Sequence, residues 1–120
     1  MDLSSPAEGR LPRTWIALLR RRVSASLAAT TGVESSADVV RYLLAGADVV
    51  MTASALLRHG PDYVGTLLGG LTNWMTWKEF ESVSSLRGIL SVPPDIEEAA
   101  YARTGRVDVL ETAKFSYSRW

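Results

Sequence analysis

The chain has 120 residues, of which 47% are apolar and 22% charged, and its 13 basic and 13 acidic residues cancel. This length predicts one small domain, and the neutral balance gives no field that would draw the chain to nucleic acid or to anionic lipid. Because cysteine is absent and histidine occurs once, thiolate catalysis, disulfides and Cys- or His-rich metal sites are excluded, and we expect no metal ion.

The beginning of the chain predicts a loop, a helix and a short strand. Serine, proline and glycine in residues 1–10 are typical of a loop, and apolar residues recur at helical spacing over 11–22. Three arginines close this helix, where they complement its dipole more often than they bind RNA. The small residues of 23–30 favour a strand, paired near 24–29, that is covered on both faces.

A second helix and a second strand follow at once. Ser35 is a good N-cap, Asp38 completes a capping box, and Gly46 ends a helix predicted over 36–45. The β-branched residues of 47–52 predict the next strand, paired near 48–52. A strand, a helix and a strand of this length favour a parallel pair and the α/β class.

The rest of the chain predicts mainly helices. Residues 54–58 favour a short helical turn, Pro61 begins a long helix through residue 75, and Ser82 caps a short one. A last helix is predicted over 96–102, and no structure is predicted for 104–120. The polar N-terminus and the lack of an apolar run near about 20 residues predict a cytoplasmic protein without a membrane span.

Two turns of small residues follow the two predicted strands. Thr31 and Gly32 come after the first strand, and Ala53 and Ser54 come after the second. In parallel α/β proteins this edge binds anionic ligands, because backbone N–H groups and small hydroxyls can surround a phosphate there. The alternative at Thr31 and Gly32 is a plain strand-to-helix turn. Ser54 is also expected to serve as an N-cap, a role that is compatible with phosphate binding. His59 is expected to pack or cap at the surface, since no carboxylate stands at a telling spacing.

Three stretches of the chain resemble the C-terminal part of the dihydroorotate dehydrogenase family, and most closely its dihydroorotate dehydrogenase-like branch. They are SSPAEGRLPRTWIALL, AATTGVESSADVVRYLLAGADVVMTASALL, and LLRHGPDYVGTLLGGLTNWM with FESVSSLRGILS. The resemblance covers about residues 2 to 92 in order and spacing. It implies that residues 1–92 are the end of an FMN-binding (βα)8 barrel, with strands seven and eight and their helices, and that 93–120 form a C-terminal helix and tail.

The resemblance also implies where FMN would bind. In this family the FMN phosphate lies between the turns after strands seven and eight, which places it here at Thr31, Gly32, Ala53 and Ser54. Thr31 and Ala53 stand where the family usually has glycine, and their β-carbons would crowd a phosphate. The backbone N–H donors of both turns are still present with these residues, and Ser54 supplies a hydroxyl.

A full barrel needs about 250 residues, so this chain resembles only the C-terminal portion of a barrel enzyme. The family's catalytic base loop and its flavin-ring contacts have no counterpart here, so no catalytic residue is assigned. Two functions follow. The resemblance implies that the chain is the FMN-phosphate segment of a flavin oxidoreductase that converts dihydroorotate to orotate, in pyrimidine biosynthesis. The short chain is then expected to be inactive, and the dihydropyrimidine to bind only in a full-length protein. Alternatively it is a non-enzymatic remnant or a self-associating module.

Overall fold

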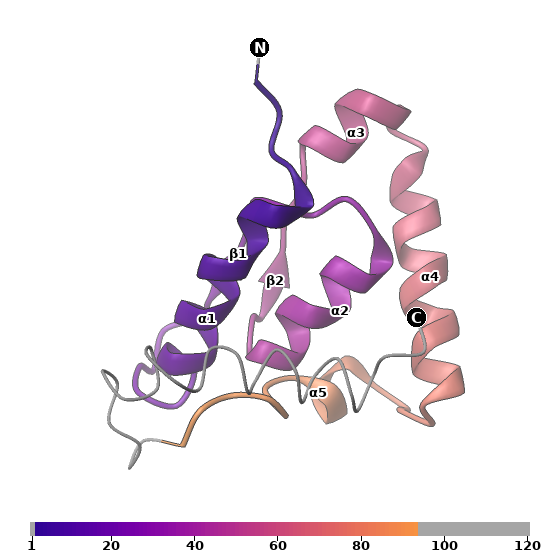
Figure 1. Cartoon of the computed structure of the whole chain (residues 1–120). Coiled ribbons are helices and arrows are strands. Elements are labelled where there is room, and N and C mark those ends of the chain that lie inside the picture. The colour runs from indigo at the N-terminus through magenta and orange to yellow at the C-terminus, as the bar shows by residue number, and fades with distance from the viewer. Residues whose placement is uncertain (1, 94–120) are drawn as a thin grey trace.

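The computed structural model describes residues 2–93, so the helix predicted at 96–102, and with it almost all of the predicted segment 93–120, lies outside the described residues. The described elements follow one another along a short α/β unit (Figure 1). In chain order they are the 3-10 helix η1 (Pro6–Gly9), α1 (Arg10–Leu19), β1 (Ala28–Ala29), α2 (Ser36–Ala45), β2 (Val49–Val50), α3 (Ser54–His59), α4 (Tyr63–Trp77) and α5 (Val83–Leu86).

The two strands pair in parallel, which confirms the predicted α/β unit of two parallel strands with flanking helices. Ala28 lies opposite Val49, and Ala29 lies opposite Val50. Each strand is shorter than predicted, because within residues 2–93 each has a neighbour on one side only. The N–H group of Met51 still donates to the carbonyl of Ala29 at 2.8 Å, so the ladder extends just past the assigned strand.

Helix α2 begins and ends where the sequence predicts. The Ser35 hydroxyl accepts from the N–H of Asp38 at 3.4 Å, and the Asp38 carboxylate accepts from the N–H of Ser35 at 3.0 Å. This reciprocal capping satisfies two backbone donors that the first turn leaves unpaired. At the other end Gly46 takes a φ of 127°, which a residue with a β-carbon rarely adopts.

Three boundaries differ from the sequence prediction. The expected N-terminal loop contains η1, because the Glu8 carboxylate accepts from the N–H of Ser5 at 3.1 Å and closes a turn. Helix α1 ends at Leu19 rather than at residue 22. Helix α4 begins at Tyr63, two residues after Pro61, since the N–H of Tyr63 first bonds back to the carbonyl of Gly60 at 3.2 Å.

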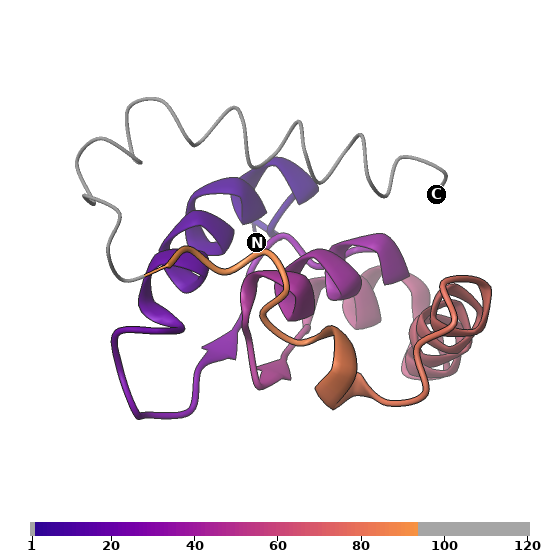
Figure 2. The ribbon, with the colours of Figure 1, turned by 90° about the horizontal axis from the view of Figure 1, so that it is seen from below.

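The core is arranged around α2. Helices α1 and α2 lie on the same side of the strand pair, and α4 packs along the outer side of α2 (Figures 1 and 2). Gly70 allows this approach, because a β-carbon there would lie 2.5 Å from Cβ of Ser36. The fully buried side chains of Tyr42 and Leu44 anchor two of three small apolar clusters. This packing fixes the ends of β1 and β2, where the two turns lie.

Candidate functional site

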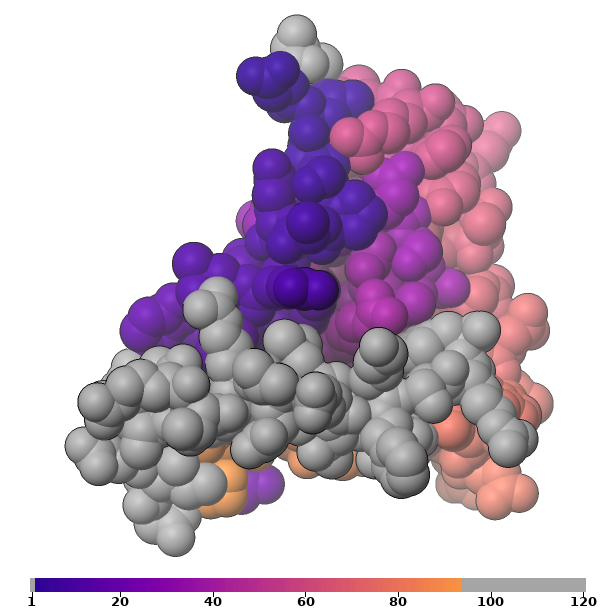
Figure 3. All heavy atoms as spheres, in the orientation of Figure 1, coloured from indigo at the N-terminus to yellow at the C-terminus, as the bar shows by residue number. Residues whose placement is uncertain are grey.

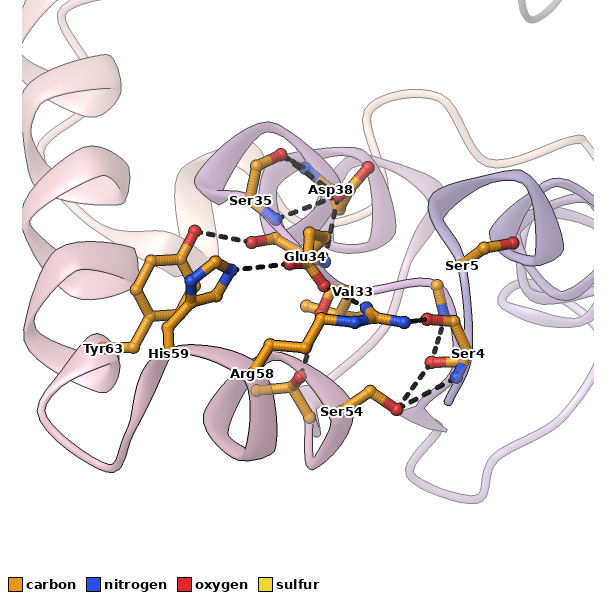
Figure 4. Close-up of polar contacts among 12 residues, drawn as sticks. Ser4, Ser5, Val33, Glu34, Ser35, Asp38, Ser54, Arg58, His59 and Tyr63 are labelled. Carbon is orange, nitrogen blue, oxygen red and sulfur yellow. Dashed lines mark hydrogen bonds and ion pairs between the residues drawn. The ribbon is translucent and has the colours of Figure 1, made fainter. Parts of the chain in front are cut away.

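The two turns after the strands meet at one oxygen atom of the N-terminal segment. Ser4 Oγ accepts from the N–H of Gly32 at 3.4 Å and donates to Ser54 Oγ at 3.0 Å. Figure 4 shows the backbone nitrogen and the Oγ of Ser4 both directed at Ser54. The structure therefore brings Gly32 and Ser54 together, and Thr31 and Ala53 are their chain neighbours.

The first turn has a backbone conformation that favours glycine. Thr31 has a φ of 73° and Gly32 a φ of 70°, so two successive residues lie in the left-handed region. The hydroxyl of buried Tyr42 donates to the carbonyls of Thr30 and Thr31, at 2.9 and 2.8 Å. Burial raises the pKa of Tyr42, so the hydroxyl keeps the proton that it donates. No local pattern in the sequence marks Tyr42 as a support of this turn, because it lies in the apolar face of α2.

Gly32 is buried beneath η1. A β-carbon at Gly32 would lie 2.5 Å from the nitrogen of Gly9 and 2.8 Å from its Cα. A side chain here would push η1 away from the turn. Substitution of Gly32 therefore disturbs the fold as well as the turn, and Ser54 is the cleaner position for testing a ligand.

Ser54 opens the second turn, but it does not cap the helix that follows. It is the first residue of α3, the N-cap position is Ala53, and no side chain caps that end. The Ser54 hydroxyl instead accepts from the N–H of Ser4 at 3.1 Å. The N-cap role expected for Ser54 is therefore wrong, and its hydroxyl is directed at Ser4 instead.

Glu34 links the first turn to α3. Its carboxylate bonds Arg58 at 2.6 Å and His59 Nε2 at 2.8 Å, and its carbonyl accepts from the Tyr63 hydroxyl at 2.8 Å (Figure 4). The hydrogen bond with His59, followed by the contacts with Arg58, lowers the pKa of Glu34, so this carboxyl is ionised near neutral pH. His59 lies at the surface as expected, and its carboxylate partner, Glu34, stands 25 positions away in the sequence, where no spacing rule indicates it.

Arg58 joins this cluster to the N-terminal segment. Its second terminal nitrogen donates to the carbonyl of Ser4 at 2.8 Å. In the space-filling view the indigo N-terminal atoms lie directly against the pink atoms of α3 (Figure 3). Thr52 adds a tie between the turns, since its hydroxyl donates to the carbonyl of Val33 at 2.9 Å. The site thus gathers a backbone N–H, a hydroxyl and a guanidinium.

This arrangement has the chemistry of an anion site. Amide and hydroxyl donors with a nearby guanidinium suit a phosphate or carboxylate. Within residues 2–93, no three His, Cys, Asp or Glu residues form a group that could hold a metal ion. In the same residues no helix is long and apolar enough to cross a membrane.

No protein-family model matches the chain, and a comparison with known proteins finds a partial similarity. A stretch of 63 residues is 30% identical to dihydropyrimidine dehydrogenase (NADP(+)), chloroplastic, of Arabidopsis thaliana. The aligned stretch covers 52% of this chain and 15% of that protein. The chain is therefore similar to a small part of a much longer dehydrogenase.

Proposed function

We propose that residues 2–92 are the FMN-phosphate-binding segment of a dihydroorotate dehydrogenase-like flavin oxidoreductase. One observation carries the proposal: the Gly32 and Ser54 turns, 22 positions apart in sequence, lie within hydrogen-bond distance of the same oxygen atom, Ser4 Oγ. The parallel strand pair supports it, because both turns lie at the carboxyl ends of their strands.

The partial similarity points the same way. Dihydroorotate is itself a dihydropyrimidine, so the relative's name and the resemblance of the sequence agree on a class of substrate. On this proposal β1 and β2 are strands seven and eight of a (βα)8 barrel, and residues 93–120 are its C-terminal helix and tail. The substrate would be bound by a full-length protein.

The described residues fit the phosphate end of FMN. Gly32 N–H and the Ser54 hydroxyl would hold phosphate oxygens, with Arg58 close by to offset their charge. When bound, FMN supplies the hydride acceptor of such an oxidoreductase. The role assigned to this chain's residues is to bind and orient the phosphate, and we propose no catalytic residue among them. The chain alone is then expected not to oxidise dihydroorotate.

A titration of isotope-labelled protein with FMN and with inorganic phosphate tests this proposal. Saturable shifts of the Gly32 and Ser54 amide signals are expected in nuclear magnetic resonance spectra with both ligands. Ser54→Ala should weaken binding roughly fivefold, the ratio that one lost hydrogen bond gives.

Thr76→Ala is the matched control, since the Thr76 hydroxyl donates within α4 to the carbonyl of Thr72. It should bind like the wild-type protein. Shifts that stay linear with ligand concentration, or that gather elsewhere on the chain, would refute the assignment of the phosphate to these turns.

A further inference from the structure

The N-terminal segment 3–9 lies across the candidate anion site, and we call it the strap. Its η1 portion covers Gly32 from one side, because Gly9 packs within 3 Å of the position where a Gly32 β-carbon would lie. Its Ser4 portion reaches the second turn through two bonds to Ser54 Oγ, at 3.0 and 3.1 Å. The strap therefore contacts both turns at once.

Ser4 Oγ occupies the place that an anionic oxygen would take. An oxygen that bonds both the Gly32 N–H and Ser54 Oγ must lie near 3 Å from each of those atoms. Ser4 Oγ lies 3.4 Å from the first and 3.0 Å from the second. A phosphate oxygen cannot share this position with the Ser4 side chain, so binding across the two turns requires Ser4 to move.

Arg58 holds the strap in this position. Its guanidinium bonds the Ser4 carbonyl at 2.8 Å, and Glu34 orients the same guanidinium through a contact of 2.6 Å. Residues 5–8 of the strap are exposed, and its η1 end is held where buried Gly9 packs on Gly32. The contacts of Ser4 with Gly32, Ser54 and Arg58 thus hold the Ser4 end of the strap in the closed position.

We propose that the strap is an autoinhibitory cover of the anion site, with Ser4 as a substitute for the anion and Arg58 as the latch. The proposal rests on the function proposed above. Phosphate binding then competes with the intramolecular contacts of Ser4, and the affinity of the closed chain is lowered by that competition. Displacement of Ser4 frees the Gly32 N–H and the Ser54 hydroxyl together.

Ser4→Gly tests the strap, because it removes both the hydroxyl and the β-carbon from the site. Titrated with inorganic phosphate and separately with FMN, this variant should bind roughly fivefold more tightly than the wild-type protein at Gly32 and Ser54. Ser4→Thr keeps the hydroxyl and should bind like wild type, as should the Thr76→Ala control. In ligand-free protein, hydrogen exchange at the Gly32 amide should be faster in Ser4→Gly than in Ser4→Thr.

Each of the other outcomes would refute the proposal that the strap covers the anion site. Equal affinity in Ser4→Gly and wild type would show that Ser4 does not compete with the anion. Weaker binding in Ser4→Gly would make Ser4 a ligand rather than a cover. Absence of binding in every variant would refute the proposed function and the cover together. If no variant binds but hydrogen exchange at the Gly32 amide is still faster in Ser4→Gly, the contact of Ser4 with Gly32 only stabilises the fold.

Discussion

At the scale of single residues, Thr31 is a β-branched residue in a backbone conformation that favours glycine. A β-branched residue with a φ of 73° carries strain, because the left-handed region crowds its β-carbon against the following carbonyl. Tyr42 opposes that strain with two hydrogen bonds to the turn, and Thr31 itself is half-buried. Thr31 thus adopts a backbone conformation that favours glycine.

Replacement of this residue by glycine tests the strain. Thr31→Gly should raise the free energy of unfolding by about 0.5–1 kcal/mol, since relief of the left-handed strain exceeds the entropy that glycine loses on folding. Urea unfolding followed by circular dichroism measures the change. Thr30→Gly is the control, because Thr30 lacks a positive φ, and it should lower stability. A Thr31→Gly protein no more stable than wild type would argue against strain at this turn.

At the scale of secondary-structure elements, Asp48 holds the ends of three segments together. Its carboxylate accepts from the N–H of Leu27 before β1 at 2.8 Å and from Arg20 after α1 at 2.7 Å. Arg87, which follows α5, approaches it at 3.8 Å. The hydrogen bond from Leu27, and next the one from Arg20, lowers the pKa of Asp48. The short strands depend on such side-chain ties because their own ladder has few bonds.

The lowered pKa of Asp48 makes the stability of the fold depend on pH. A carboxyl whose pKa is lower in the folded state stabilises the fold above the unfolded pKa, and that stabilisation is lost as pH falls through the folded value. Stability of the wild-type protein should therefore drop below about pH 4, the ordinary range of an aspartate. At neutral pH, Asp48→Asn should lower the free energy of unfolding by about 1 kcal/mol, because solvent screens this partly exposed carboxylate. The stability of this variant should also fall less steeply than that of the wild-type protein as the pH is lowered.

Urea midpoints measured from pH 7 to pH 3 check this prediction. Glu34 also has a lowered pKa, so Glu34→Gln is the matched variant, and it should retain the part of the acid response that belongs to Asp48. Parallel pH profiles for wild type and Asp48→Asn would show that Asp48 does not link stability to pH.

At the scale of the whole molecule, the strand pair leaves one face open in the described residues. Val50 packs among buried residues of α2, so Val49 and Met51 point to the opposite face, where they are 54% and 46% exposed. Leu57 on α3 and Leu68 on α4 are also more than half exposed. Exposed apolar side chains beside unpaired strand edges favour association with more sheet, either a longer chain or a second copy.

Self-association of the isolated chain follows from this exposure. Met51→Glu places a charge on the open face and should shift the protein toward monomer, with the apparent mass in light scattering falling across a concentration series. Asn73→Glu adds the same charge at an exposed position of α4 and should leave the mass unchanged. A monomeric wild-type protein with strongly protected amides at residues 49–51 would contradict this prediction and show that the chain closes its own core.

The sequence alone determined the elements whose signals are local. Helix α2 was predicted at its observed bounds because a capping box, a helical apolar pattern and a terminal glycine all act within one helical length. The parallel pairing followed from the order strand, helix, strand. The strands were predicted too long, since strand length depends on partners that the local pattern does not contain.

The tertiary structure alone decided what fills the site. Ser4 meets Ser54 across 50 positions, and Glu34 meets His59 across 25, and no spacing rule within one element connects such pairs. The position of the two turns was predictable because parallel strands end at a common edge. The strap over them was not, because it depends on how η1 packs on Gly32 after the strands and α2 have assembled. Local patterns set where donors lie, and only the packed chain sets which groups they meet.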